Sequence, residues 1–329
     1  MTSQKDSYPS QNGSYPINEE REMSLKEKVE ILKSLQESTL DPSKLQEYLK
    51  YTSIPGLSVP ILKKVLEYLT DLDSQISASY EILSDEDWER VISGECSILD
   101  KNFDVKTKID CFEMYFKLFY EILVSNDISS VLDILAPLFK IKTKNIQFLI
   151  LLVAKSNPKP VFGYVLSNLK KAPLIYCPFF SSLLVRLNFD FEIKQKCLAV
   201  FLRYISENKP SNSVQYLLLL QSLMYILCFK EFSTAFMSES DVLKADNSHE
   251  KQTAIIDVDR IWELIKKGEE MNSFAYLNRD VVSKFCEIYK LKEPAYHAPK
   301  NGLFSFFPFD LPVIPGIEKV IQNDYITFN

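Results

Sequence analysis

Glycine is scarce in this chain, and the scarcity limits the folds that the chain can adopt. The sequence has 7 glycines in 329 residues, whereas an average chain is about 7% glycine. No two of these glycines lie within a dozen positions of each other. A Rossmann fingerprint or a P-loop needs two or three glycines within about eight residues, so that backbone N–H groups can reach a phosphate. Both nucleotide-binding motifs are therefore excluded, and no cofactor is expected.

The same scarcity disfavours folds built from tight β-hairpins. Such hairpins use Asn-Gly or Asp-Gly pairs in their turns, and the chain has only Asn12-Gly13 and Asn301-Gly302. Apolar residues instead recur at spacings of three and four, which is typical of amphipathic helices. The clearest such stripe comprises Ile109, Phe112, Phe116, Phe119 and Leu123. The predicted fold class is all-α.

The pattern predicts helices of about ten to twenty residues joined by short turns. Helices are expected to begin near Ser24, Pro42, Ser58, Asp73, Ile109, Ile128, Lys144, Pro158, Pro173, Phe191, Val214, Val258 and Arg279. Paired in order, they form units of about 30 to 45 residues, which fit a stack of helical hairpins of the HEAT or armadillo type, an α-solenoid. An irregular globular all-α fold is the alternative.

Several helices carry local signals that make sharper expectations. Leu25, Val29, Leu32 and Leu35 predict one buried apolar stripe on the first helix. The Ser84–Asp87 segment has the form of a capping box or an acidic first turn, which predicts a break near Ser84 in the helix expected from Asp73. Residues 214–229 are apolar almost all round, which predicts a helix enclosed by its neighbours. Further helices are expected over 128–139 and 144–154.

The chain is expected to have three parts. Residues 1–22 are rich in Ser, Gln, Asn, Tyr and Pro and lack an apolar stretch, so they predict a disordered N-terminal tail without a signal peptide. Residues 23–292 predict the helical repeat domain. Residues 293–329 are rich in proline and aromatic residues. The longest apolar stretch, 216–229, is too short to span a bilayer, so no membrane segment is expected.

The last part contains a dense phenylalanine cluster around Pro308. Exposure of a phenylalanine costs about 1.5 to 3 kcal/mol relative to burial, so the cluster is expected to be covered. In one hypothesis the segment folds back and caps the groove between the last helices. In the other, it is an exposed docking motif for a partner.

Charge is unevenly distributed. The net charge is −6, with 10 basic and 19 acidic residues in positions 1–100, 11 and 6 in 101–171, and 17 and 19 in 172–329. An acidic chain is a poor candidate for binding DNA on its own, because phosphates are neutralised by clustered Lys and Arg. The basic middle could face an acidic protein surface, or could be an ordinary solvated face. Its candidate partner-binding residues are Lys140, Lys142, Lys144, Lys155, Lys159, Lys170 and Lys171.

Residues suited to catalysis or metal binding are few. The six cysteines lie at least fifteen residues apart, mostly among apolar neighbours, which predicts buried thiols in a reducing compartment. His249 and His297 are the only histidines, and both are expected to be exposed. With two histidines and no zinc spacing, no metal site is expected. Acidic pairs such as Asp257 and Asp259 mark helix starts, where the macrodipole favours them. The chain is therefore expected not to be an enzyme.

Four ordered blocks in the second half of the chain resemble one known family. The blocks are Ser182–Arg186 followed by Lys194, Lys196, Cys197 and Leu198; Gln221–Lys230; Asn278–Leu291; and Phe304–Asp310 followed by Val313, Ile317, Lys319, Ile321 and Tyr325. In order and approximate spacing they are similar to blocks of the RNA polymerase I-specific transcription initiation factors (the TIF-IA family). The resemblance covers about residues 178–329, and the first half is similar in architecture alone.

Some positions match the motifs of that family and others depart from them. The matching motif residues, expected to be structural, are Tyr225, Cys228, Phe229, Phe304, Phe306, Phe307, Pro308, Phe309 and Asp310. Arg279 stands where the family has a proline. The chain is also much shorter than other members and lacks their long acidic insertion, so it resembles a shortened member.

The resemblance implies a HEAT-repeat stack and a bridging function in the nucleus and nucleolus. Members bind RNA polymerase I near its stalk and link it to promoter-bound core factor for ribosomal RNA gene transcription, without sequence-specific binding of nucleic acid. It also implies a serine patch where phosphates would repel an acidic partner; Ser125, Ser129 and Ser130 are the candidates. A homodimer of the free protein is consistent with the resemblance.

A second hypothesis starts from the helical architecture alone. HEAT-like adaptors in trafficking or nuclear transport hold peptide ligands in a concave face, often with ladders of Asn or Trp at the repeat spacing. Here Trp88 and Trp262 are the only tryptophans. The proteins recovered with this chain from a cell extract would separate the two hypotheses.

Overall fold

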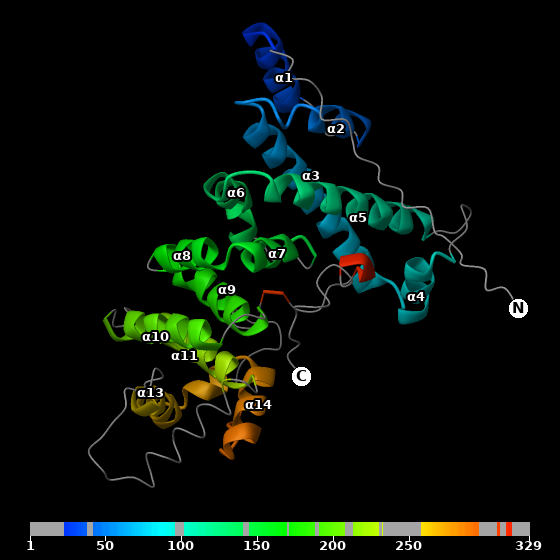
Figure 1. The fold of residues 1–329 in the computed structure, drawn as a ribbon. Helices are drawn as coiled ribbons and strands as arrows, with labels where there is room; N and C mark the ends of the chain where they lie inside the picture. The colour runs from blue at the N-terminus through cyan, green and yellow to red at the C-terminus, as the bar shows by residue number, and fades with distance from the viewer. Residues whose placement is uncertain are drawn as a thin grey trace, which may run out of the picture. The chain divides into compact units, whose positions relative to one another are not determined.

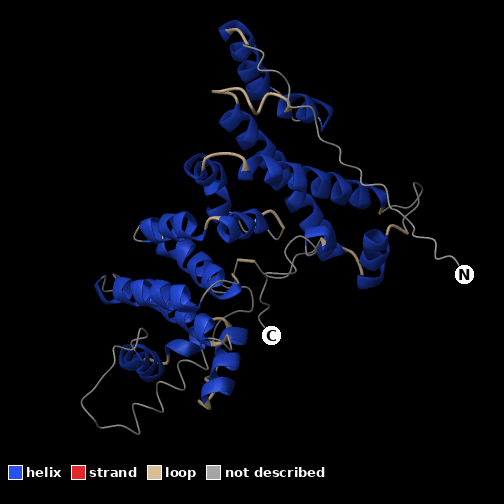
Figure 2. Ribbon diagram, in the orientation of Figure 1, coloured by secondary structure: helices blue, strands red, loops and turns tan. Residues whose placement is uncertain are grey.

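The structure is a computed structural model that describes residues 23–37, 42–95, 102–140, 145–169, 171–187, 191–207, 213–229, 232, 258–295, 308–309 and 314–317. Within these ranges the regular elements are α-helices and two 3₁₀ helices, with no β-strand (Figure 2). The prediction of an all-α fold is confirmed. The N-terminal tail predicted for residues 1–22 lies outside the described residues.

The chain divides into two compact units, residues 1–61 and 62–329. This division does not coincide with the domain boundaries expected after residues 22 and 292. It falls within one helix, α3 (Ser58–Ile82). The contacts that position the candidate site all lie within the second unit.

The first unit contains α1 (Leu25–Glu37), α2 (Pro42–Leu49) and the first turn of α3 (Figure 1). A capping box starts α1: the Ser24 hydroxyl accepts a hydrogen bond from Glu27 N at 3.3 Å, and the Glu27 carboxylate accepts one from Ser24 N at 2.9 Å. Pro42 is the first residue of α2, as predicted, because its fixed φ suits the start of a helix.

The apolar stripe predicted for α1 is buried only near the C-terminal end of the helix. Leu35 is 5% exposed, and Ser34 Oγ lies 2.5 Å from the Tyr48 hydroxyl of α2. Leu25 is 79% exposed and Val29 is 41% exposed. The prediction that these two residues are buried is therefore wrong, because spacing reveals a stripe but not how much of it a neighbour covers.

In the second unit, α3 continues through Asp73, where the sequence predicted the start of a new helix. Asp73 is fully buried, and its carboxylate accepts hydrogen bonds from residues 145 and 146 instead of capping a helix. The predicted break at Asp73 is therefore wrong. The break at Ser84 is confirmed, because the Ser84 hydroxyl accepts a hydrogen bond from Asp87 N at 3.2 Å and starts α4 (Asp85–Ser93).

The next helix, α5 (Phe103–Val124), buries all five members of the predicted 109–123 stripe. Asp127 then caps α6 (Ile128–Leu135) by accepting hydrogen bonds from Ser129 N and Ser130 N. The helix expected over 128–139 changes to a 3₁₀ helix, η1 (Ala136–Lys140). Pro137 lies at this change and lacks the N–H that an α-helix would use.

Five further helices form the middle of the second unit. They are α7 (Phe148–Ser156), α8 (Pro158–Leu169), α9 (Pro173–Arg186), α10 (Phe191–Glu207) and α11 (Ser213–Leu227). The helix start predicted near Lys144 instead falls at Phe148, because Asn145 N and Ile146 N are bonded to Asp73 and are not part of the helix. The prediction of an enclosed helix is confirmed for the buried stretch 218–227 of α11.

The unit continues with α13 (Val258–Glu270), η2 (Ser273–Tyr276) and α14 (Arg279–Tyr289). Neighbouring contacts largely follow chain order: α5 packs on α6, α6 on α8, α8 on α9, α9 on α11, and α11 on α14. Figure 1 shows α9 between α8 and α11. Both α9 and α11 are almost fully buried over their C-terminal halves.

The described part of the C-terminal segment returns to the middle of the unit. Phe309 packs against Phe148 of α7 and Phe179 of α9, and Gly316 N donates a hydrogen bond to Glu113 of α5 at 3.1 Å. For these residues, the expectation that the segment packs on the last helices is wrong. The nearest helices in sequence do not hold it, because its partners are polar and aromatic groups far earlier in the chain.

Candidate functional site

A buried polar cluster lies where the C-terminal segment meets the helices. Asp73 Oδ1 accepts a hydrogen bond from Asn145 Nδ2 at 2.7 Å, and Oδ2 accepts from Asn145 N and Ile146 N, each at 3.1 Å. The side-chain oxygen of Asn145 in turn accepts a hydrogen bond from Ile314 N at 3.1 Å. Asp73, Asn145 and Ile314 are all 0% exposed. One carboxylate thus joins α3, the turn before α7 and the C-terminal segment.

Sequence reasoning missed this cluster. Asp73 has the local pattern of a helix start, and its partner lies 72 residues away. The one available signal was an acidic residue on the apolar side of a helix, between Leu69, Leu72 and Ile76. Such a residue is rarely buried unless it is paired.

An aromatic pocket next to the cluster holds Phe309. Its ring centroid lies 6.0 Å from that of Phe148 and 5.7 Å from that of Phe179, and the residue is 1% exposed. Its φ of 64° is unusual for a bulky residue. The expectation that the aromatic cluster is covered is thus confirmed for Phe309, and Pro308 is buried as well. Phe304, Phe306, Phe307 and Asp310 lie outside the described residues.

A second set of buried polar contacts joins α9, α11 and α14. Arg186, 2% exposed, donates a hydrogen bond from Nη2 to the Tyr225 hydroxyl at 2.9 Å. Gln221 Oε1 accepts a hydrogen bond from Asn278 N at 2.7 Å. The Tyr289 hydroxyl donates to the Leu227 carbonyl at 3.1 Å. Residues from three of the four blocks that carry the family resemblance are therefore in direct contact.

The motif residues at the end of α11 are all buried. The Tyr225 and Phe229 rings lie 5.3 Å apart, edge to face, and both residues are buried. The Cys228 thiol lies 3.6 Å from the Val281 carbonyl, to which it donates. These side chains fix α11 against α14.

The thiols are poorly suited to nucleophilic chemistry. Burial raises the pKa of Cys177 and Cys228 far above the ordinary value for a thiol. Burial also raises the pKa of Cys286 to about 11, with Glu293 and Glu269 adding to the effect. The thiolate is the reactive form, so these three groups stay protonated near neutral pH. The prediction of buried thiols holds for them, whereas Cys111 and Cys197 are half-buried.

We expect thiol reagents to separate these two classes. At pH 8 a small alkylating reagent should modify Cys111 and Cys197 at least about tenfold faster than the three buried thiols, because reagent reaches the buried thiols poorly and burial raises their pKa. Peptide mass spectrometry over a time course measures each site. In urea all six thiols, including Cys96, which lies outside the described residues, should react at similar rates. Equal rates in the folded protein would contradict the assignment.

The described lysines of the basic middle fall into two groups. Lys155 near the end of α7 and Lys159 near the start of α8 flank one turn, whereas Lys171 lies beyond the other end of α8. At 1.5 Å of rise per residue, Lys159 and Lys171 are about 18 Å apart along the helix. All three are exposed. Lys140 ends η1, and Lys142, Lys144 and Lys170 lie outside the described residues.

Sequence inspection could have found a stronger charge signal in this region. Between Asp133 and Asp190 the chain has no acidic residue, and it has seven lysines and Arg186. Arg186 is buried, so the charge that these helices expose comes from lysine alone. Helices α7, α8 and α9 therefore carry no carboxylate of their own to neutralise a basic surface.

The candidate serines lie at the junction of α5 and α6. Ser125 is exposed and donates its hydroxyl to the Ile122 carbonyl at 2.8 Å, and Ser129 and Ser130 form the first turn of α6. A phosphate on Ser129 or Ser130 would be favoured by the N-terminus of the helix but repelled by the Asp127 carboxylate that caps it.

Other kinds of site are not apparent in the described part of the chain. Among the described residues no group of three or more His, Cys, Asp or Glu could hold a metal ion. No described helix combines the length and apolar character needed to cross a membrane. His249 and His297 lie outside the described ranges. Comparison of the sequence with models of protein families gives no match, and comparison with curated proteins gives none either.

Proposed function

We propose that this protein is an RNA polymerase I transcription initiation factor that binds the polymerase and bridges it to promoter-bound core factor. The observation that carries the proposal is the position of the blocks similar to the TIF-IA family. Arg186 and Tyr225 come from two blocks and share a buried hydrogen bond, and Gln221 and Asn278 come from two blocks and share a part-buried one. The blocks that carry the resemblance therefore lie on helices that pack on one another.

The arrangement of helices supports a scaffold of stacked hairpins. In the described residues, the strongest helix contacts join elements that are close in chain order, such as α7 with α8, α8 with α9, and α9 with α11. Contacts between nearby elements are typical of HEAT-type solenoids, and we propose that architecture here. A bridging factor needs a stiff body that presents separate surfaces, and a solenoid supplies both. The absence of a nucleotide motif is consistent with such a role.

The surface over α7 and α8 is the proposed contact with the polymerase. It exposes Lys155 and Lys159, and Lys171 follows α8. Between Asp133 and Asp190 the chain supplies no acidic residue to offset them. A basic surface attracts an acidic protein partner and accelerates encounter.

Charge reversal tests this placement. The triple variant Lys155→Glu, Lys159→Glu, Lys171→Glu should weaken polymerase binding at least about tenfold and reduce its dependence on salt, because rim charges act mainly on association. The matched control, which makes the same charge change on other exposed lysines, is Lys117→Glu, Lys266→Glu, Lys290→Glu. A second triple variant reverses Lys140, Lys142 and Lys144. Unchanged binding in both test variants would show that the surface is placed wrongly.

Recovery of partners from a cell extract tests the function itself. The tagged full chain should recover subunits of RNA polymerase I and of the core promoter factor. Recovery of transport receptors or coat proteins would instead support the HEAT-type adaptor and contradict the proposal. The proposal also places the protein in the nucleus and nucleolus, and includes a homodimer of the free form, which light scattering measures directly.

A further inference from the structure

We propose that the surface formed by Glu113, Asn145, Phe148 and Phe179, called here the tail site, is a peptide-binding site. Its ligand is the C-terminal stretch of the same chain that carries Phe309 and Ile314–Ile317, held in a way that a free peptide can replace. The chemical class of the ligand is a short apolar peptide that inserts one phenylalanine and offers two backbone N–H groups. This inference does not depend on the proposed function.

The receptor groups are fixed by contacts that do not involve the ligand. The Asn145 side-chain amide donates to Asp73 at 2.7 Å, which directs its oxygen toward Ile314 N. The Phe179 ring packs edge to face on Phe139, 4.9 Å away. A site that is already ordered loses little conformational entropy when its ligand binds. The tail site therefore has the character of a prepared receptor.

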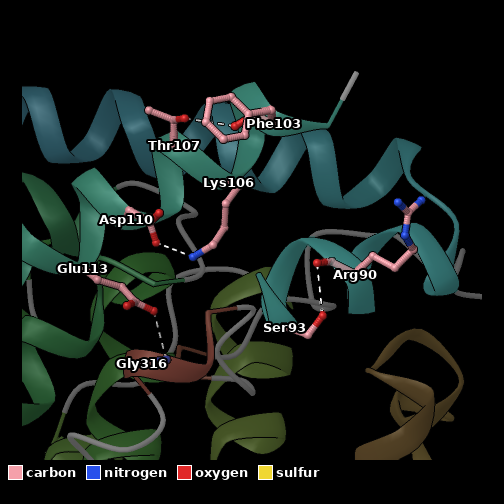
Figure 3. A network of polar contacts seen from close by, with 8 residues as sticks. All are labelled: Arg90, Ser93, Phe103, Lys106, Thr107, Asp110, Glu113 and Gly316. Atoms are coloured by element: carbon pink, nitrogen blue, oxygen red, sulfur yellow. Dashed lines mark hydrogen bonds and ion pairs between the residues drawn. The ribbon is translucent and has the colours of Figure 1, made fainter. Parts of the chain in front are cut away.

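The ligand fits this receptor through specific features. Phe309 fills the aromatic pocket, and Ile314 and Ile317 are 0% and 1% exposed. Glu113 projects from α5 toward Gly316, and its Oε1 accepts a hydrogen bond from Gly316 N at 3.1 Å (Figure 3). A Cβ at position 316 would overlap the Glu113 carboxylate. The carboxylate would have to shift, which disturbs the hydrogen bond that it accepts from Gly316 N.

The connection to the rest of the chain suits an exchangeable ligand. Twelve residues separate Ala295, which follows α14, from Pro308. Ile314 N and Gly316 N each donate a hydrogen bond to a side-chain oxygen of the helical part of the chain. A tethered ligand has an effective concentration near millimolar, so the intact chain stays occupied even if the free peptide binds with modest affinity.

The test cuts the tether in the full chain. A protease site replaces residues 297–302, and the protein is cleaved after folding. We expect the C-terminal fragment to co-elute with the N-terminal fragment, which contains all the helices from α1 to α14, in size-exclusion chromatography. A fluorescent peptide of residues 304–319 should then replace it, with saturable anisotropy and a stoichiometry of one. A peptide with Phe309→Ala should bind at least about tenfold more weakly, a peptide with Gly316→Ala should be weakened by a smaller factor, and a scrambled peptide should not bind.

Substitutions in the tail site itself give a second readout, the rate of peptide release. Glu113→Ala should speed peptide release about tenfold, whereas Glu113→Gln, which keeps an oxygen acceptor, should have a smaller effect. Glu121→Ala, an exposed change on the same helix, is the control. Three results would overturn the proposal: a fragment that never exchanges while the helical circular dichroism is retained, loss of that signal on cleavage, or equal binding of the wild-type and variant peptides.

Discussion

Replacement of Asp73 by alanine should lower the free energy of unfolding by about 3 to 5 kcal/mol, since each buried donor left without an acceptor costs about 1 to 3 kcal/mol. Three donors lose their acceptor in this variant: Asn145 N, Asn145 Nδ2 and Ile146 N. Asn145 then no longer holds its oxygen toward Ile314. The change therefore acts on the turn before α7 and on the C-terminal segment together.

Urea denaturation followed by circular dichroism measures this effect. Asp71→Ala is the matched control, because Asp71 lies two positions before Asp73 on the same helix but is exposed. It should change stability by less than about 0.5 kcal/mol. Asp73→Asn should fall between the two, because its amide keeps one oxygen acceptor but faces donors with its NH₂ group. Equal midpoints for Asp73→Ala and Asp71→Ala would contradict the account of the cluster.

Replacement of Arg186 by alanine should be the second most damaging change, by about 3 to 5 kcal/mol. The side chain is among the largest that are fully buried, so its loss leaves a cavity between α9 and α11. It also removes the donor to the Tyr225 hydroxyl, which is itself buried. Tyr225→Phe keeps the ring and removes only the hydroxyl, and should cost about 1.5 to 3 kcal/mol, as for other hydrogen bonds to a charged group.

A double-mutant cycle separates the hydrogen bond from the packing. The combined variant Arg186→Ala, Tyr225→Phe should be less destabilised than the sum of the single changes, with a coupling of about 1 kcal/mol or more. Arg203→Ala, an exposed arginine on α10, is the control and should have little effect. Strict additivity would show that the 2.9 Å contact contributes nothing to the joining of the two helices.

Local structure was predictable wherever the signal is local. Prolines mark the first residues of α2, α8 and α9, because proline fixes φ and needs no hydrogen-bond acceptor there. The capping box at Ser84 places the break between α3 and α4 correctly. The spacing of three and four identifies the buried face of α5.

The predictions that were wrong concern residues whose contacts lie far away in the sequence. Asp73 was assigned to a helix start because its partners lie 72 and 73 residues away. Gly316 and Glu113 are 203 residues apart, so nothing near the C-terminal segment could indicate which helices receive it. The exposure of Leu25 was missed for a related reason, since an apolar stripe does not reveal how far its neighbour extends.

For the candidate site, the sequence predicted which residues take part better than it predicted where they lie relative to one another. The lysines of the middle segment were identified from the charge distribution, and Lys155, Lys159 and Lys171 are exposed in the structure. Their separation into two groups follows from the length of α8, which a charge count does not contain. The polar contacts between the blocks that resemble the TIF-IA family needed the fold, because Arg186 and Tyr225 are 39 residues apart.

Direct binding to purified polymerases tests the central claim. The full chain, labelled with a fluorophore, is titrated with RNA polymerase I and, in parallel, with RNA polymerase II. We predict a one-to-one complex with RNA polymerase I that is at least about tenfold weaker with the Lys155, Lys159 and Lys171 charge-reversal variant, and no comparable complex with RNA polymerase II. Absence of binding to RNA polymerase I, or equal binding to both enzymes by a protein that retains its helical circular dichroism, would contradict the proposed function.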